Sequence, residues 1–210
     1  MTALTLLHTS PAHVPVFEAL RDAHHPGAVL RHLVAPELLD RARDRGPESV
    51  AAELLALLAD ADGPVLVTCS TIGAVAESLA PALGVPVVRV DRPMAAEAVR
   101  RGARIVVLAT VESTFGPTRA LIAEEAGTRA VSVRTRLVAG AWELFEAGDT
   151  PGYLAAVARA ADAVTDADAV VLAQASMAGA APLVRTTVPV LSSPRPGLDA
   201  GLRLTGRPAG

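Results

Sequence analysis

The sequence predicts an α/β protein built as two pseudo-symmetric lobes, each a parallel sheet flanked by helices. Short runs of Val, Ile and Leu alternate along the chain with longer runs rich in Ala and Leu. The short runs are almost continuously apolar, which is typical of parallel strands buried on both faces. In addition, one strand–turn–helix–strand segment recurs in outline in the second half of the chain. Together these observations favour βαβ crossovers in two similar units.

Strands are expected where β-branched and other apolar residues cluster between turn residues. In chain order these are residues 4–8, 29–34, 65–68, 87–90, 105–109, 130–133, 169–173 and 188–191. Helices are expected where Ala and Leu recur at helical spacing. In chain order these are residues 14–22, 49–61, 73–82, 95–100, 117–126 and 152–165.

The recurring segment begins at Pro64 as PVLVTCSTIGAVAESLAPALGVPVVRVDRP and at Ala169 as AVVLAQASMAGAAPLVRTTVPVLSSPRP. Each copy is expected to have a hydrophobic strand, a small polar turn, an Ala-rich helix and a Val-Pro-Val that opens a second strand. Ligands of parallel sheets bind beyond the carboxyl ends of the strands, so two such units predict an active-site cleft between the lobes. We expect one lobe to comprise residues 1–91 plus 195–210 and the other to comprise residues 92–194.

The composition excludes several classes of function. The net charge is −3, only 2% of the residues are aromatic, and no basic stripe is present, so we expect no nucleic-acid partner. No lysine is present, which excludes Schiff-base chemistry, pyridoxal phosphate anchoring and a P-loop. A single cysteine excludes a disulfide framework and a thiolate-rich zinc site, and no histidine has metal-ligand spacing.

We expect a cytoplasmic protein that does not enter the membrane. The N-terminus lacks a basic start followed by a long apolar run, as a signal peptide would have. The longest apolar stretches are interrupted well short of the ~20 residues that a membrane span requires. A lone thiol stays reduced in the cytoplasm.

Cys69 directly follows an apolar strand and precedes Ser70, Thr71 and an Ala-rich helix. A thiol at that place meets unpaired backbone N–H groups and the positive end of the helix dipole, which favour the thiolate. The same N–H groups, with the hydroxyls of Ser70 and Thr71, can hold a substrate carboxylate. The alternative is a small buried cysteine, with a hydroxyl that only caps the helix.

Three segments resemble the aspartate/glutamate/hydantoin racemase superfamily, which includes arylmalonate decarboxylase and maleate isomerase relatives. V-T-C-S-T-I-G, followed by G-V-P-V-V-R-V-D-R-P-M, resembles the family's first catalytic turn. I-V-V-L-A-T-V-E-S-T resembles its threonine-bearing strand end, and V-V-L-A-Q-A-S-M-A with V-P-V-L-S-S-P resembles its second catalytic turn. The segments follow the family's order from Pro64 to Pro194. The resemblance implies two pseudo-symmetric lobes with the active site between them.

The family's racemases use two cysteines and no cofactor. One thiolate removes the α-proton of a carboxylic acid, and the other thiol returns a proton on the opposite face. The resemblance implies that Cys69 is the first of these, whereas Gln174 stands where the second is expected. Glutamine is neither an acid nor a base in the accessible pH range.

The missing second cysteine leaves three alternatives. His8, Glu112 or Ser176 can serve as a substitute acid. A one-thiol reaction is the second alternative, since arylmalonate decarboxylase protonates an enediolate after CO₂ loss with one cysteine, which lies in its second turn. The third is a protein that only binds small molecules.

Supporting roles fall on residues at the other strand ends. His8 ends the first expected strand and has a side chain suited to proton transfer near neutrality, although a local hydrogen bond would also explain it. The resemblance implies that Thr110 and Thr114 bind the substrate carboxylate; otherwise they cap a helix. The remaining histidines, His32 among them, are expected at the surface or at helix ends.

We therefore expect a cofactor-independent isomerase of the racemase type that transfers a proton at the α-carbon of a small carboxylate. A decarboxylase of a malonate-type acid is the alternative enzyme class. The expected catalytic residues are Cys69 and His8, and the expected substrate-binding residues are Ser70, Thr71, Thr110, Thr114, Gln174, Ala175 and Ser176. No metal, cofactor, nucleic-acid or membrane partner is expected, and a homodimer is the default assembly.

Overall fold

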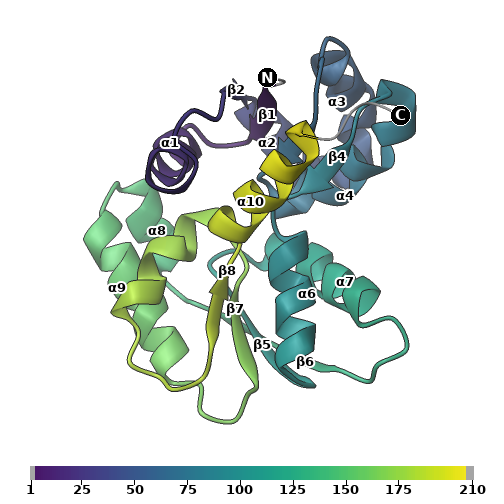
Figure 1. Ribbon diagram of the computed structural model, residues 1–210. Coiled ribbons are helices and arrows are strands. Elements are labelled where there is room, and N and C mark those ends of the chain that lie inside the picture. Colours follow the sequence, from purple (N-terminus) through teal and green to yellow (C-terminus); the bar gives the residue numbers. More distant parts are fainter. Residues whose placement is uncertain (1–2, 207–210) are drawn as a thin grey trace. The chain divides into compact units, whose positions relative to one another are not determined.

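The computed structural model describes residues 3–206, and the chain forms two compact units. Unit 1 is Met1–Asp91 with Pro194–Gly210, and unit 2 is Arg92–Ser193. Each unit holds a four-stranded sheet in which every strand pair is parallel, in the orders β2-β1-β3-β4 and β6-β5-β7-β8 (Figure 1). The predicted α/β class with two parallel sheets is confirmed, whereas the cleft between the lobes stays a prediction.

Unit 1 follows the strand–helix alternation of its sequence. Its strands are β1 (Leu4–His8), β2 (Leu30–Val34), β3 (Val65–Val67) and β4 (Val87–Arg89). Its helices are α1 (His13–His24), α2 (Pro36–Arg45), η1 (Pro47–Val50), α3 (Ala51–Leu58), α4 (Ser70–Ser78), α5 (Ala80–Leu83) and α10 (Pro194–Thr205).

Both faces of the unit 1 sheet are covered, as the continuous apolar strands predict. Leu4 and Leu6 of β1 pack with Phe17 of α1 and Leu198 of α10. Leu7 points to the opposite face and joins the cluster formed with α2, α3 and α4. Successive strand residues alternate between the two faces, so an entirely apolar strand can bury all of its side chains only in a doubly covered sheet.

Unit 2 repeats this plan. Its strands are β5 (Arg104–Ala109), β6 (Ser132–Leu137), β7 (Ala169–Leu172) and β8 (Val190–Ser192). Its helices are α6 (Arg92–Arg101), η2 (Glu112–Thr114), α7 (Phe115–Ala126), α8 (Ala141–Glu146), α9 (Thr150–Asp162) and η3 (Ala175–Leu183). One face of its sheet packs on α6 and α7 and the other on α8, α9 and η3.

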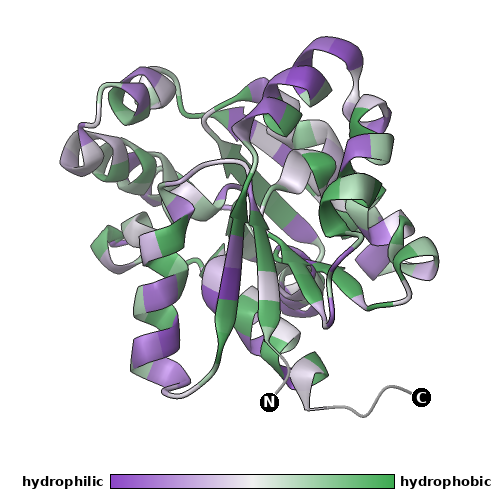
Figure 2. Ribbon diagram, turned by 90° about the horizontal axis from the view of Figure 1, so that it is seen from above, coloured by the Kyte–Doolittle hydropathy of each residue, from purple (hydrophilic) through white to green (hydrophobic). Residues whose placement is uncertain are grey.

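The hydropathy of the chain agrees with this layered burial. Figure 2 shows strands that are largely hydrophobic, some with hydrophilic segments, among helices that carry hydrophilic residues on part of their surface. No helix among residues 3–206 combines the length and the apolar character needed to cross a bilayer.

Equivalent positions in the two units follow from the strand registers. Leu7 lies opposite Val67 in unit 1, as Leu108 lies opposite Leu172 in unit 2. The N–H of the residue after β3 donates to Leu7 O over 2.9 Å, and the N–H of the residue after β7 donates to Leu108 O over 3.0 Å. Counting one residue further, Cys69 of unit 1 occupies the same position as Gln174 of unit 2.

Three α-helices were not expected from the sequence: α2, α8 and α10. The α10 segment contains two prolines and two glycines, which locally indicate a turn. Its glycines instead allow close packing: a Cβ at Gly197 would lie 2.4 Å from the carbonyl oxygen of Val90, and one at Gly201 would lie 2.9 Å from a Leu4 methyl. Tertiary contact therefore decides the structure of this segment.

Candidate active site

Cys69 lies between the carboxyl end of β3 and the first residue of α4. It is the N-cap of that helix, with extended backbone angles of φ −106° and ψ 118°. Its side chain is 8% exposed and belongs to the apolar cluster on the α4 face of the sheet. Ser70 is half-buried and Thr71 is buried in the first turn of α4. The N–H groups of this turn have no partner within the helix, as at every helix start.

A buried ion pair lies against this turn. Arg89 of β4 donates through Nε and Nη2 to the two carboxylate oxygens of Asp91, each over 2.9 Å. Both side chains are almost fully buried. A Cβ at Gly73 would lie only 3.1 Å from Nε of Arg89, so the glycine lets the guanidinium lie directly against α4. The pairing satisfies the buried charge and gives the first turn of α4 a rigid support.

His8, at the end of β1, is linked to the residue before Cys69. Its Nδ1 lies 2.8 Å from the Thr68 hydroxyl oxygen, and its Nε2 lies 2.8 Å from Nδ1 of His32. The side chain is fully buried, and burial lowers the pKa of His8 to about 3, with further lowering from His13 and His32. Both ring nitrogens of His8 are thus already hydrogen-bonded within the protein. A direct proton-transfer role for His8 stays a prediction.

His32 was expected at the surface or at a helix end. It instead lies in β2, with its side chain only 15% exposed, and its Nε2 lies 2.8 Å from Oε1 of Glu18. Its ring stacks on that of His8, with centroids 5.1 Å apart and an angle of 17° between the planes. The surface prediction for His32 is therefore wrong, because β2 brings it against the end of β1.

The second turn, in unit 2, contains Gln174 at the position equivalent to Cys69. Gln174 is the N-cap of η3, with φ −118° and ψ 140°. Its side-chain oxygen accepts hydrogen bonds from the backbone N–H and the hydroxyl of Thr110, over 2.7 and 2.9 Å. The amide orientation is thereby fixed, because only the oxygen can accept both bonds. Ala175 is buried and Ser176 is partly exposed in the same turn.

Tyr153 joins this group, although its sequence position gave no sign of it. Its hydroxyl lies 2.8 Å from Oγ of Ser176, and its side chain is only 1% exposed. Burial raises the pKa of Tyr153, and hydrogen bonds with Ser176 and Thr110 partly oppose that change. The phenol is therefore neutral at physiological pH. The chain contains a single tyrosine, which is the one signal that could have drawn attention to it.

Glu112 and Thr114 lie in η2, and no hydrogen bond among the described residues joins them to Gln174, Ser176 or Tyr153. Thr114 is buried at the junction of η2 and α7, with helical backbone angles and no side-chain cap bond. Glu112 is exposed at the start of η2. Binding of a carboxylate by Thr114 stays a prediction.

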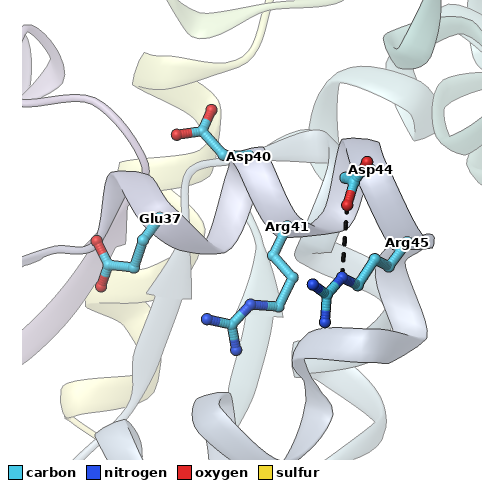
Figure 3. A pocket seen from close by; sticks show the side chains of 5 residues that line it. All are labelled: Glu37, Asp40, Arg41, Asp44 and Arg45. Carbon is cyan, nitrogen blue, oxygen red and sulfur yellow. Dashed lines mark hydrogen bonds and ion pairs between the residues drawn. The ribbon is translucent and has the colours of Figure 1, made fainter.

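Three surface hollows of the described chain do not involve the predicted site residues. One, of about 320 Å³, is lined by five charged side chains of α2, as Figure 3 shows: Glu37, Asp40, Arg41, Asp44 and Arg45. All five come from one exposed helix face, where Asp44 pairs with Arg45 over 3.4 Å. Two others lie beside α10 and beside α7. Among residues 3–206, no three His, Cys, Asp or Glu side chains are grouped to hold a metal ion.

Comparison with known proteins agrees with this arrangement. A family model described as Asp/Glu/Hydantoin racemase matches residues 8–200. Allantoin racemase from Pseudomonas fluorescens has the same fold, with 18% identity, a TM-score of 0.65, and coverage of 97% of this chain and 90% of that chain. A glutamate racemase isoform from Bacillus anthracis is 17% identical, with a TM-score of 0.69, and the match covers 95% of this chain and 79% of that chain. A liganded double mutant of arylmalonate decarboxylase is 23% identical, with a TM-score of 0.64, and the match covers 100% of this chain and 97% of that chain. No curated protein matches the sequence.

Proposed function

The chain belongs to the Asp/Glu/hydantoin racemase family, and we propose that it is a cofactor-independent enzyme that transfers a proton at the α-carbon of a small carboxylate. One observation carries the proposal: Cys69 is the N-cap of α4 at the carboxyl end of β3, and unit 2 has the same turn without a thiol. A strand end followed by a helix start is where parallel sheets bind ligands.

Cys69 is the proposed acid/base. Its thiolate would take the α-proton, or its thiol would protonate a carbanion-like intermediate, and in either direction the proton moves between sulfur and carbon. Ser70 and Thr71 are proposed to bind the substrate carboxylate through their hydroxyls and the N–H groups of the first turn of α4. Thr110, Thr114, Gln174, Ala175 and Ser176 are the proposed binding residues of unit 2.

The Gln174–Thr110 pair favours a second candidate reaction. The turn equivalent to that of Cys69 holds the neutral amide of Gln174 and no thiol. The amide oxygen already accepts two hydrogen bonds from Thr110. A reaction that needs one proton carrier fits this arrangement. Decarboxylation of a malonate-type acid, with Cys69 protonating the enediolate after CO₂ leaves, is such a reaction.

The test is exchange of the α-proton in deuterium oxide, followed by NMR. The panel contains aspartate, glutamate, hydantoins and aryl- and alkylmalonates, and each sample is read for α-deuterium, optical inversion and CO₂ loss. We expect Cys69→Ala to lose about a hundredfold or more of the rate. Ser78→Ala is the matched control, because its hydroxyl bonds to Val75 O in the same helix, away from the turn.

The outcomes separate the candidates. Inversion that depends on Cys69 supports an isomerase, and CO₂ loss without inversion supports the decarboxylase. Activity that survives in Cys69→Ala would contradict the thiol mechanism. No reaction on the panel, together with a Cys69 that iodoacetamide alkylates no faster in native than in urea-unfolded protein, would favour a binding protein.

Location and assembly belong to the same proposal. A cytoplasmic location would keep the lone thiol reduced. A homodimer is the proposed assembly, because two-fold dimers are the commonest oligomers. Light scattering coupled to size-exclusion chromatography tests the assembly directly.

A further inference from the structure

A continuous chain of hydrogen bonds runs from a partly exposed carboxylate to the residue before Cys69. Glu18 of α1 is 33% exposed, and its Oε1 lies 2.8 Å from Nε2 of His32. Nδ1 of His32 lies 2.8 Å from Nε2 of His8, and Nδ1 of His8 lies 2.8 Å from Oγ1 of Thr68. The Thr68 hydroxyl in turn donates to Leu7 O over 3.0 Å.

The protons in this chain can be counted from its end. The single hydroxyl proton of Thr68 goes to Leu7 O, so Nδ1 of His8 must carry a proton and donate to Thr68. His8 is neutral, so its Nε2 has a lone pair and accepts from Nδ1–H of His32. The carboxylate of Glu18 accepts from Nε2–H of His32. His32 therefore carries both ring protons and forms an ion pair with Glu18.

Loss of one proton from His32 changes every bond in the chain beyond the Glu18–His32 bond. If His32 keeps only its Nε2 proton for Glu18, its Nδ1 becomes an acceptor and His8 must place its proton on Nε2. Nδ1 of His8 then becomes an acceptor, and the Thr68 hydroxyl must turn from Leu7 O to His8. The protonation of His32 therefore decides whether the hydroxyl of Thr68, the residue before Cys69, points to Leu7 O or to His8.

We propose that Glu18, His32 and His8 form a relay that holds the Thr68 hydroxyl on Leu7 O and so positions the turn that carries Cys69. Glu18 and His32 are positioning residues in this relay, since they act through His8 and Thr68. The effect on turnover rests on the proposed function of Cys69. The proton positions themselves do not.

Other charged groups around the relay come from α1. Arg21 pairs with the second carboxylate oxygen of Glu18 and also with Asp22. The ring of His13 lies 6.1 Å from that of His8, and burial lowers the pKa of His13 to about 4. A neutral His13 adds no charge to the relay near neutral pH. The carboxylate of Glu18 is thus the acidic group in direct contact with His32.

Nitrogen-15 NMR of the imidazole rings near neutral pH tests the relay without any substrate. We expect wild-type His32 to show two protonated nitrogens and His8 to carry its proton on Nδ1. In Glu18→Gln, His32 should become neutral and the His8 proton should move to Nε2. His25→Gln is the matched control, because His25 forms a similar pair with Asp199 (2.6 Å) in the same unit without contacting the relay.

Two rates then read the effect at Cys69. Iodoacetamide alkylation of the thiol should differ by about fivefold between wild type and Glu18→Gln, as the change of one internal hydrogen bond predicts, and His25→Gln should match wild type. Any α-proton exchange should fall by a similar factor. Urea unfolding of each variant identifies a loss of folding.

The relay and the proposed function fail in different ways. A His8 proton on Nε2 in the wild type, or one that stays on Nδ1 in Glu18→Gln, overturns the relay even if the protein is an active enzyme. An alkylation rate that Glu18→Gln shares with wild type also overturns it. If the panel shows no turnover while the imidazole signals and alkylation rates change as expected, the relay stands and only the proposed reaction fails.

Discussion

The side-chain oxygen of Gln174 accepts two hydrogen bonds from a single residue, the backbone N–H and the hydroxyl of Thr110, over 2.7 and 2.9 Å. Both lone pairs of that oxygen are used, so the amide N–H groups must point away from Thr110. Gln174 occupies in unit 2 the position that Cys69 occupies in unit 1. The turn of unit 1 thus presents the thiol of Cys69. The equivalent turn of unit 2 presents the amide of Gln174, which is a fixed, neutral hydrogen-bond donor.

Replacement of Gln174 by cysteine tests whether the second turn lacks only its proton carrier. If the chain transfers protons through Cys69, Gln174→Cys should increase optical inversion of a reactive substrate by about tenfold or more, since a positioned acid/base group contributes on that scale or above. Chiral chromatography of the product measures inversion, and α-deuterium uptake is recorded in the same sample.

Gln174→Ser is the control for that gain, because it removes the amide and leaves a hydroxyl without a thiol. Equal inversion by the cysteine and serine variants would count against the interpretation. The double variant with Cys69→Ala should lose inversion again, because two carriers are then reduced to one.

Tyr153 and Ser176 should be coupled in stability. The phenol is 1% exposed and its hydroxyl lies 2.8 Å from Oγ of Ser176, so each loses a partner when the other is changed. Tyr153→Phe should lower the free energy of unfolding by about 1 kcal/mol. A double-mutant cycle with Ser176→Ala, read by urea unfolding, should show a coupling of about 0.5–1.5 kcal/mol. Strict additivity would show that the two hydroxyls do not interact in solution.

Burial of His8 should make stability depend on pH. Its pKa is about 3 in the folded chain and about 6.5 when unfolded, so the unfolded state binds the extra proton between these values. Stability is therefore full above about pH 6.5 and falls as the pH drops towards 3. The loss from His8 should reach about 2 kcal/mol near pH 5. The lowered pKa of His13, about 4, acts in the same direction.

Urea unfolding of wild type and His8→Gln near pH 7.5 and near pH 5 measures this contribution. The variant should lose about 2 kcal/mol less on acidification, because it has no proton to gain at that position. His24→Gln, at the exposed end of α1, controls for the loss of a histidine elsewhere. If His8→Gln and wild type lose the same free energy of unfolding between about pH 7.5 and about pH 5, His8 does not contribute to the loss of stability in acid.

The sequence predicted the strands well because their signal is local. All eight occur, and β1 has the expected bounds of Leu4–His8, since a buried parallel strand needs an unbroken apolar run. The bounds of β6 shifted to Ser132–Leu137 because this edge strand is mostly exposed and carries Arg134 and Arg136. An exposed edge tolerates polar residues, so its pattern resembles a loop.

The side-chain partners could not be predicted, because they connect residues far apart in sequence. His8 meets Thr68 across 60 residues and His32 across 24, and neither pair has a local spacing that indicates contact. Tyr153 reaches Ser176 across 23 residues. The sequence predicts the strand ends as the place for chemistry. The pairing of β1 with β2 and β3, and the packing of α9, decide which side chains meet there.

The packing of α10 on unit 1 gives a last prediction. A Cβ at Gly197 would lie 2.4 Å from Val90 O and 2.5 Å from a Val90 methyl, and backbone atoms cannot move aside as a flexible side chain can. Gly197→Ala should therefore destabilise the chain by about 1–3 kcal/mol, although alanine is the better helix former. Gly116→Ala is the matched control, because no atom beyond its chain neighbours and the nearby backbone of α7 lies within 4 Å of its Cβ position. It should be neutral or stabilising by up to about 1 kcal/mol. Urea unfolding measures both. Equal stability of the two variants would mean that α10 packs less closely in solution.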